Sequence, residues 1–228
     1  PLNLAPLPAD AQAGGLIRAL WKELGGSLGG QVRGGNVPVG ARLLTQHESA
    51  PLADAVRDIN KFSNNVMARQ VFLTLGAANP QSGDTARDAA SAVRASLARH
   101  GIDTQGFAFE NGAGLSRHER VTAAGLGEML RAAQATPFWA EFASLLPRPG
   151  GEGTLKRRLP ALAEQARFKT GTLNDVRALA GYLDAGGRRW AVVLIANRAG
   201  ISNAQLDQVL EGLYPQLEAA GHDAAGLQ

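Results

Sequence analysis

Cysteine is absent from the 228 residues, and lysine is scarce. Without a thiol, the chain cannot form a disulfide framework, a zinc ribbon or a cysteine nucleophile. Most of the 23 basic residues are arginines, and the lysines are Lys22, Lys61, Lys156 and Lys169. Because arginine stays charged and cannot serve as a base, a reaction that needs a lysine base has few candidates here.

Long apolar runs and blocks of one charge are also missing. No hydrophobic run approaches the roughly 18 residues that suggest a membrane-spanning helix. The net charge is +3, and basic residues are spread along the chain without a run of five. We therefore expect no transmembrane helix and no nucleic-acid partner.

Patterns for metal, phosphate and dinucleotide binding fail as well. His47-Glu48 has no second histidine four residues on, and the other histidines are scattered. The Gly-rich stretch 25–35 lacks the Gly-Lys-Ser/Thr of a phosphate loop, and 112–117 lacks the third glycine of a dinucleotide fingerprint. These stretches are interpreted as turns, and we predict neither a metal site nor a cofactor.

The apolar spacing predicts helices followed by an antiparallel sheet. Two apolar runs, Arg177–Asp184 and Arg188–Asn197, flank a Gly-Gly turn, as in a β-hairpin. A helix capped by Ser202 or Asn203 follows, so the predicted class is α+β with helices packed on the sheet. Helices are predicted at 10–24, twice within 49–78, at 85–100, 123–134, near 137–146 and at 203–220; 27–47 is predicted as strands and turns, and Trp21, Trp139, Phe142 and Trp190 as core.

Two short elements carry polar side chains suited to chemistry. Ser63-Asn64-Asn65 lies between two predicted helices, and Lys169-Thr170-Gly171, followed by Thr172, opens a predicted strand. Taken singly, Ser63 is explained as a helix-cap hydroxyl and Lys169 as a solvated strand end. Taken together and in this order, they match the Ser-x-Asn and Lys-Thr-Gly members of the signature set of penicillin-binding proteins and serine β-lactamases.

Four longer blocks extend this match: "HESAPLADAVRDINKFSNNVMARQVFLTLG", "ENGAGLSRHERVTAAGLGEML", "GGEGTLKRRL" and "ARFKTGTLNDVRALAGYLD". From about Leu16 to Leu217, the chain resembles the type-4 penicillin-binding proteins, the D-alanyl-D-alanine carboxypeptidase/endopeptidases of bacterial cell-wall metabolism. The resemblance implies the penicillin-binding/serine β-lactamase-like transpeptidase fold, incomplete at the N-terminus. It also implies that 46–228 is the C-terminal part of the peptidase domain, and that 1–45 is the end of an inserted accessory domain with its connection.

The resemblance assigns Ser63, Asn65 and Lys169 to catalysis by acyl transfer. Ser63 would pass a proton toward the leaving amine, and Asn65 would hold the substrate's peptide group or the catalytic lysine. Lys169 would add positive potential to the cleft and bond the Ser63 oxygen. We therefore expect Ser63 and Lys169 to lie within hydrogen-bond reach or one water apart.

The same resemblance makes Thr170, Gly171 and Thr172 substrate-binding residues. The two hydroxyls would face the terminal carboxylate of the substrate, and Gly171 would let the substrate backbone approach closely. An extended peptide would then add to the strand edge. The Thr172 N–H would be one half of an oxyanion hole.

Three further features admit two interpretations each. Lys61 either adds positive potential to the cleft or is a solvated side chain. The 110–117 segment either lines the cleft or forms a tight turn, and its glycines favour the turn. Thr154 either supports the site or caps a helix, and we favour the cap.

The family's nucleophile element, Ser-x-x-Lys, is absent. The residues three positions before the four lysines are Ala19, Asp58, Gly153 and Ala166. The expected explanation is that Pro1 lies inside a longer natural chain, so that these 228 residues alone are inactive while the intact protein is a serine-type D-Ala-D-Ala carboxypeptidase. A homologue that never had a nucleophile stays open as an alternative.

The resemblance implies peptidoglycan stem peptides as substrates and β-lactam antibiotics as acylating inhibitors. It implies a periplasmic or otherwise exported protein, with room for peripheral membrane or homo-oligomer contacts in the intact protein. Two other functions stay open: a non-catalytic cell-wall binding homologue, and a β-lactamase or esterase relative. A Ser-x-x-Lys upstream in the natural gene would distinguish the first of these from a peptidase.

Overall fold

The structure, a computed structural model, describes residues 7–225 and divides into two units at Ser49 and Ala50. In the first unit, α1 (Ala9–Glu23) is the only helix or strand among the described residues. The predicted helix at 10–24 is confirmed, but the strands predicted within 27–47 are wrong. The assignment of this unit to an inserted accessory domain stays a prediction.

Hydrophobic side chains of the first unit lie at its surface. Trp21 is 49% exposed, so its predicted place in a core is wrong. Val37 and Val39 are more exposed still. One helix and an irregular chain offer no second apolar layer to cover such residues, and apolar runs without a partner strand do not form a sheet.

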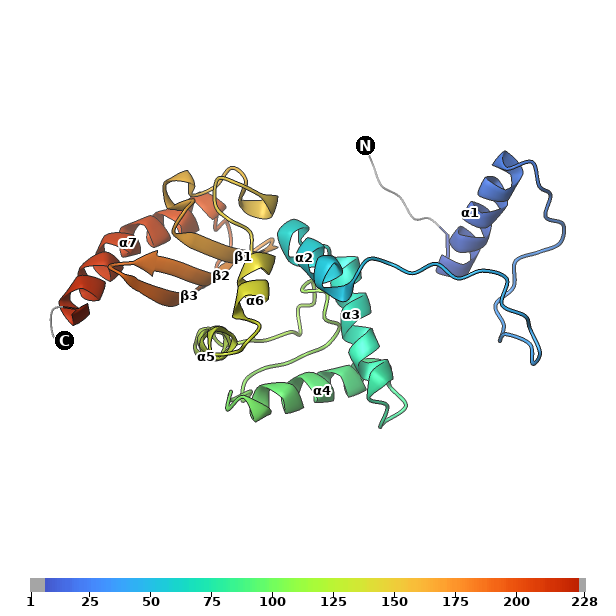
Figure 1. Ribbon diagram of the computed structural model, residues 1–228, viewed down its shortest axis with the longest axis horizontal. Helices are drawn as coiled ribbons and strands as arrows, with labels where there is room; N and C mark the ends of the chain where they lie inside the picture. Colours follow the sequence, from blue (N-terminus) through green and yellow to red (C-terminus); the bar gives the residue numbers. More distant parts are fainter. Residues whose placement is uncertain (1–6, 226–228) are drawn as a thin grey trace. The chain divides into compact units, whose positions relative to one another are not determined.

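The second unit contains the remaining elements in the order helices, sheet, helix (Figure 1). Its three strands are β1 (Ala166–Leu173), β2 (Val176–Ala185) and β3 (Arg188–Asn197). Its helices are α2 (Leu52–Phe62), α3 (Asn65–Ala78), α4 (Thr85–Arg99), α5 (Ala123–Gln134), α6 (Trp139–Leu145), the 3-10 turns η1 (Gly153–Leu155) and η2 (Pro160–Leu162), and α7 (Asn203–Ala225). None of the helices within 7–225 combines the length and apolar character that crossing a membrane requires.

The sheet is antiparallel in the order β1-β2-β3, which confirms the predicted α+β class. Gly186 and Gly187 join β2 to β3 with φ angles of 57° and 72°. A two-residue hairpin turn of this kind needs positive φ at both positions, which glycine adopts without steric cost. The predicted hairpin is therefore confirmed, and its turn fixes which residues of β2 and β3 lie opposite each other.

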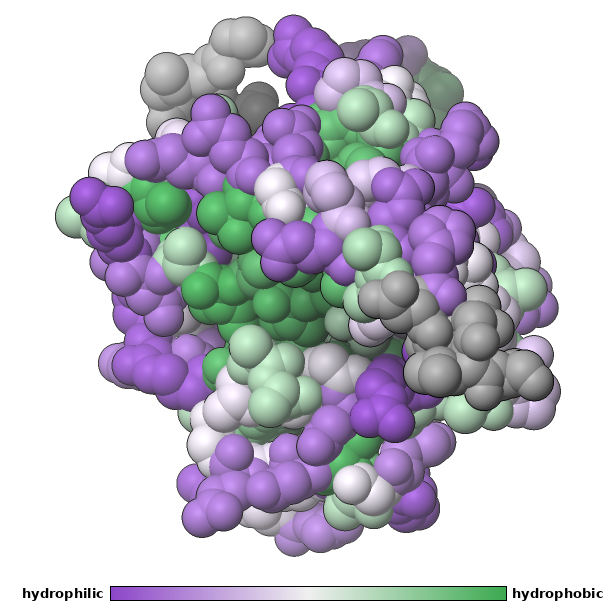
Figure 2. Space-filling model, turned by 90° about the vertical axis from the view of Figure 1, so that its left-hand side faces the viewer, coloured by the Kyte–Doolittle hydropathy of each residue, from purple (hydrophilic) through white to green (hydrophobic). Residues whose placement is uncertain are grey.

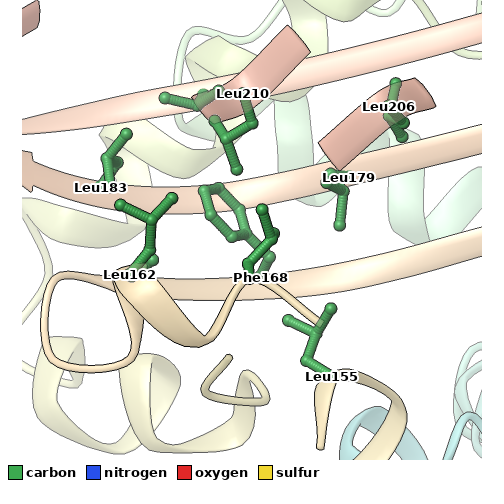
Figure 3. Close-up of a cluster of buried hydrophobic side chains, with 10 residues drawn as sticks. Leu155, Leu162, Phe168, Leu179, Leu183, Leu206 and Leu210 are labelled. Atoms are coloured by element: carbon green, nitrogen blue, oxygen red, sulfur yellow. The ribbon is translucent and has the colours of Figure 1, made fainter. Parts of the chain in front are cut away.

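One face of the sheet packs on α7. Phe168, Leu179 and Leu183 are fully buried there against Leu206 and Leu210 of the helix. Figure 3 shows these side chains pointing toward one another between the strands and α7, with Leu155 and Leu162 of the 3-10 turns at the margin. Ser202 caps α7, because its hydroxyl accepts from Gln205 N at 3.2 Å.

The opposite face of the sheet packs on α5 and α6. Tyr182 is 2% exposed and stacks edge-on against Trp139, with ring centroids 4.6 Å apart. The partly buried Phe142 packs on the same cluster, and the partly buried Trp190 packs on the α7 side. The core placement predicted for Trp139, Phe142 and Trp190 is therefore confirmed. The sheet is therefore the middle layer of three.

Local capping explains where the helices begin. Thr122 accepts from Gly125 N, Asp84 from Ala86 N and Arg87 N, and Asn64 from Met67 N. Each side chain satisfies a backbone donor that the first helical turn leaves free.

Seen from the end of the molecule on the left of Figure 1, hydrophobic residues gather in the middle of the face and hydrophilic residues border them (Figure 2).

Candidate functional site

A cleft of about 500 Å³ opens in the second unit between the α2–α3 junction, the loop at 112–115 and the end of β1. Ser63 and Asn65 line it from the junction, and Lys169 through Thr172 line it from the strand. All six site residues predicted from the sequence therefore border one cavity, although 106 positions separate Ser63 from Lys169. Their catalytic and binding roles stay predictions.

Ser63 stands in a left-handed backbone conformation. It ends α2 with φ 55° and ψ 50°, and its N–H bonds Ile59 O. Asn64 then begins the next helix at once. A non-glycine residue in this region costs about 1–2 kcal/mol, and such strain is found at sites where the surrounding structure holds a side chain in place. The two-residue joint between helices directs Ser63 into the cleft.

Asn65 is the first residue of α3 and connects the junction to the loop at 110–119. Its amide Nδ2 donates to Ala113 O at 2.5 Å. The loop is closed by Glu119, whose Oε1 accepts from Asn111 N and Gly112 N. The structure thus shows that this loop lines the cleft, whereas the sequence favoured a simple turn.

Lys169 points toward Ser63. Its Nζ donates to Ser63 Oγ at 3.0 Å and to Thr170 O at 2.7 Å, which confirms the predicted proximity of the two motifs. Burial lowers the pKa of Lys169 below its ordinary value, because removal from water disfavours the charged form. An ammonium with a lowered pKa, at hydrogen-bond distance from a hydroxyl, can stabilise negative charge on the hydroxyl oxygen or exchange a proton with the hydroxyl.

Within residues 7–225, no strand pairs with the outer edge of β1 beside the cleft. Phe168 N donates away from the sheet, to Pro147 O, whereas Gln165 O accepts from Asp184 N within it. Because successive residues of an antiparallel strand alternate in direction, the main-chain groups of Thr170 and Thr172 also face outward. The Thr172 N–H is therefore placed to donate to a bound group.

Gly171 has a packing role that the sequence did not reveal. A Cβ at this position would lie 3.2 Å from the Cβ of Ala178 on β2, which is tighter than ordinary contact. Glycine thus serves the pairing of β1 with β2 as well as any close approach of a ligand.

Two expectations for neighbouring residues are wrong. Thr154 does not cap a helix: it lies inside η1, and Thr170 Oγ1 donates to its hydroxyl at 2.8 Å. Lys61 is neither solvated nor aimed at the cleft, because it is buried in an ion pair with Glu152. Glu152 and Thr154 belong to one of the four sequence blocks that resemble the family. Their partners, Lys61 and Thr170, lie 91 and 16 positions away, so local sequence patterns do not predict these contacts.

The arrangement provides a hydroxyl, an ammonium, and outward main-chain donors along one edge. Such a set suits an extended peptide with a carbonyl that becomes negatively charged. Among residues 7–225, no group of three or more His, Cys, Asp or Glu side chains is placed to hold a metal ion.

Comparisons with known proteins show the family to which the chain belongs. The sequence profile of the D-Ala-D-Ala carboxypeptidase 3 (S13) family matches residues 2–214. The D-alanyl-D-alanine carboxypeptidase of Actinomadura sp. is 31% identical over 98% of this chain and 44% of its own length. Carboxypeptidase DacB of Mycolicibacterium smegmatis is 38% identical over 71% of this chain and 37% of its own length. The chain thus spans less than half of these relatives.

The fold is shared with a solved structure. Penicillin binding protein 4 (dacB) of Haemophilus influenzae, solved in complex with a β-lactam, matches with a TM-score of 0.80 and 25% identity. The match covers 95% of this chain and 53% of that one. The predicted penicillin-binding fold and the resemblance to type-4 penicillin-binding proteins are therefore confirmed, and the chain belongs to the D-Ala-D-Ala carboxypeptidase 3 (S13) family.

Proposed function

We propose that this chain forms one side of the active site of a serine D-Ala-D-Ala carboxypeptidase/endopeptidase, which trims peptidoglycan peptides and is acylated by β-lactams. The observation that carries the proposal is the 3.0 Å hydrogen bond from Lys169 Nζ to Ser63 Oγ, at the open edge of β1. Membership in the D-Ala-D-Ala carboxypeptidase 3 (S13) family supports peptidoglycan stem peptides as the substrate class.

The chemistry assigns each residue a step. The substrate peptide would extend along the outer edge of β1, with its terminal carboxylate near the hydroxyls of Thr170 and Thr172. The Thr172 N–H would stabilise the oxyanion of the tetrahedral intermediate. Ser63, held by Lys169, would pass a proton to the leaving D-alanine amine, and water would then hydrolyse the acyl-enzyme.

The proposal places the attacking serine outside these 228 residues. None of the four lysines has a serine three positions before it. Ser63 bonds the lysine of the Lys-Thr-Gly motif, Lys169, and has no lysine three residues after it to serve as its base. The proposal therefore requires a Ser-x-x-Lys from sequence outside the 228 residues. It also places the protein where peptidoglycan is, in the periplasm or otherwise outside the cytoplasmic membrane.

The test is labelling with fluorescent penicillin, followed by a denaturing gel and intact-mass analysis. The natural protein should gain one penicilloyl group on a serine of a Ser-x-x-Lys, and these 228 residues alone should gain none. A stoichiometric adduct on any serine of this chain would contradict the assignment of Ser63. A natural protein that binds cell-wall peptides without acylation would instead be a non-catalytic homologue.

A further inference from the structure

A short segment, Glu152–Thr154, contacts both walls of the cleft. One wall is the end of α2 with Ser63, and the other is the end of β1 with Lys169 and Thr170. These walls come from parts of the chain about a hundred residues apart, since 106 positions separate Ser63 from Lys169. Their spacing decides whether the Ser63–Lys169 hydrogen bond forms, so whatever holds them together acts on the site.

The first contact is an ion pair to α2. Lys61, two residues before Ser63, is 9% exposed and its Nζ bonds Glu152 Oε1. A lysine so buried requires a partner, because an unpaired buried charge is strongly destabilising. Arg148, whose Nε lies 4.0 Å from the same carboxylate, is half exposed and does not replace Lys61. Glu152 thus holds the last turn of α2 in place.

The second contact is between backbones. Gly153 has φ +56°, and a Cβ there would lie 2.1 Å from Lys61 O. Only glycine combines this conformation with this approach. The segment therefore lies directly against the main chain that leads into Ser63, with no side chain between them.

The third contact is to β1. Thr154 Oγ1 accepts the hydrogen bond from Thr170 Oγ1 at 2.8 Å. The segment is itself anchored, because Leu155 is fully buried in the α7 core and Arg158 makes two bonds to Asp207 of α7, at 3.0 and 2.6 Å. Thr154 therefore connects the cleft end of β1, through Thr170, to the segment that is anchored in the α7 core.

We infer that Glu152, Gly153 and Thr154 form a positioning bridge, which sets the distance between Ser63 and Lys169 without contacting the substrate's reacting atoms. The inference rests on the proposed function for its effect on catalysis. Glu152 fixes the serine side through Lys61, and Thr154 fixes the strand side through Thr170. Releasing either contact should let the two walls separate and water reach Lys169.

The first experiment measures acylation in the natural protein, with the rate constant of acylation separated from penicillin affinity by stopped flow. Thr154→Val, which replaces the hydroxyl by a methyl group of similar size, should lower the rate constant about tenfold. Glu152→Gln should do likewise, because small displacements of reacting groups are costly. Thr154→Ser should keep the rate within about twofold, since it keeps the acceptor oxygen.

A matched control is Asp184→Asn, which removes the carboxylate of an exposed ion pair with Arg189 at the far end of the hairpin. Its acylation rate should equal that of the unmodified protein. Wild-type rates in both Thr154→Val and Glu152→Gln would overturn the bridge while leaving the proposed function intact. An equal loss in Thr154→Ser and Thr154→Val would also overturn it, since the hydroxyl would then not matter.

The second experiment needs no acylation and uses these 228 residues. Only four lysines are present, so carbon-13-labelled lysine gives few NMR signals and Lys169 can be assigned by substitution. The pKa of Lys169, lowered by burial, should rise toward its ordinary value in Thr154→Val and Glu152→Gln but not in Asp184→Asn. An unchanged pKa in both bridge variants overturns the inference, even if the natural protein proves unable to react with penicillin.

Discussion

The two halves of β1 differ sharply in what surrounds them. In the first half, Ala166 and Phe168 are 2% and 0% exposed and pack against α7. In the second half, Lys169 through Thr172 line the cleft, and the strand edge beside them is open. One strand therefore serves as a core element and, one residue later, as the wall of a site. The core half gives the cleft half a rigid support, which a site on a loop would lack.

The largest expected effect comes from the core half. Phe168→Ala should lower the free energy of unfolding by about 3–5 kcal/mol, because it leaves a cavity where a fully buried ring had packed. Chemical denaturation followed by circular dichroism measures this loss. A cost below about 1 kcal/mol would mean that the strand is not anchored through Phe168, and the comparison between the halves would fail.

The opposite face of the core half should give the next effect. Tyr182, which pairs with Arg167 of β1, donates its buried hydroxyl to Leu130 O at 2.6 Å. Tyr182→Phe removes this hydrogen bond, while Leu130 O keeps its place in the backbone bonding of α5, so the variant should cost about 0.5–1.5 kcal/mol by denaturant titration. A neutral result would show that water reaches Leu130 O.

Tyr182 also predicts a pH dependence. Burial raises its pKa to about 12. Because the folded pKa exceeds the ordinary value of 10.0, the stabilisation is complete below pH 10 and is lost as the pH rises toward 12. Absorbance of tyrosinate at alkaline pH should show this late titration in the native protein, and Tyr182→Phe should remove it.

Substitution of Lys169 in the cleft half should stabilise the fold, whereas the substitutions in the core half destabilise it. Lys169→Met should raise the unfolding midpoint by about 2–4 °C, the shift that about 1 kcal/mol gives in a protein of this size. The wild-type penalty is complete once the pH falls below the lowered pKa of Lys169 and is absent above the ordinary lysine pKa of 10.5, so the gain in the variant should shrink as the pH rises toward 10.5.

Acylation of the natural protein completes this prediction. The Lys169→Met variant should lose penicillin labelling although it is more stable, as expected where a site is built at the expense of stability. Calorimetry measures the midpoint and gel fluorescence the labelling. A variant that is both less stable and fully labelled would contradict the division of β1 into core and cleft halves.

The smallest effect is expected at the tip beyond the cleft half. Arg117 pairs with Asp175 in the β1–β2 turn, and both side chains are about half exposed. Arg117→Gln should change the free energy of unfolding by less than about 1 kcal/mol, because exposed ion pairs contribute little. A larger loss in denaturant titration would show that the tip, too, supports the fold.

Whether a feature could be predicted from the sequence depends on how far apart along the chain its interacting residues lie. The helix starts at Asn203 and Ala123 and the Gly186-Gly187 hairpin depend on neighbouring residues, and they were predicted. The Ser63–Lys169 contact is distant, yet two family motifs identified it. The bridge from Glu152 to Lys61 joins positions 91 apart outside those motifs, and only the folded packing reveals it.

The failure at 27–47 has a different origin. Short apolar runs there resemble strands, but strands need partners, and the first unit supplies none among its described residues. Trp21 was assigned to a core for a similar reason, since a large apolar side chain predicts burial only where a second layer exists.

The hairpin that ends in β3 has a consequence for handling the protein. Among the residues that the structure describes, β3 pairs only with β2, so its outer edge presents unsatisfied main-chain groups. Residues 190–195 form an uncharged run, Trp-Ala-Val-Val-Leu-Ile, of the kind that associates into intermolecular sheets. Arg188, Arg189 and Arg198 flank it as charged gatekeepers. We expect this chain, isolated at high concentration and high salt, to aggregate edge to edge, and low salt to keep it dispersed.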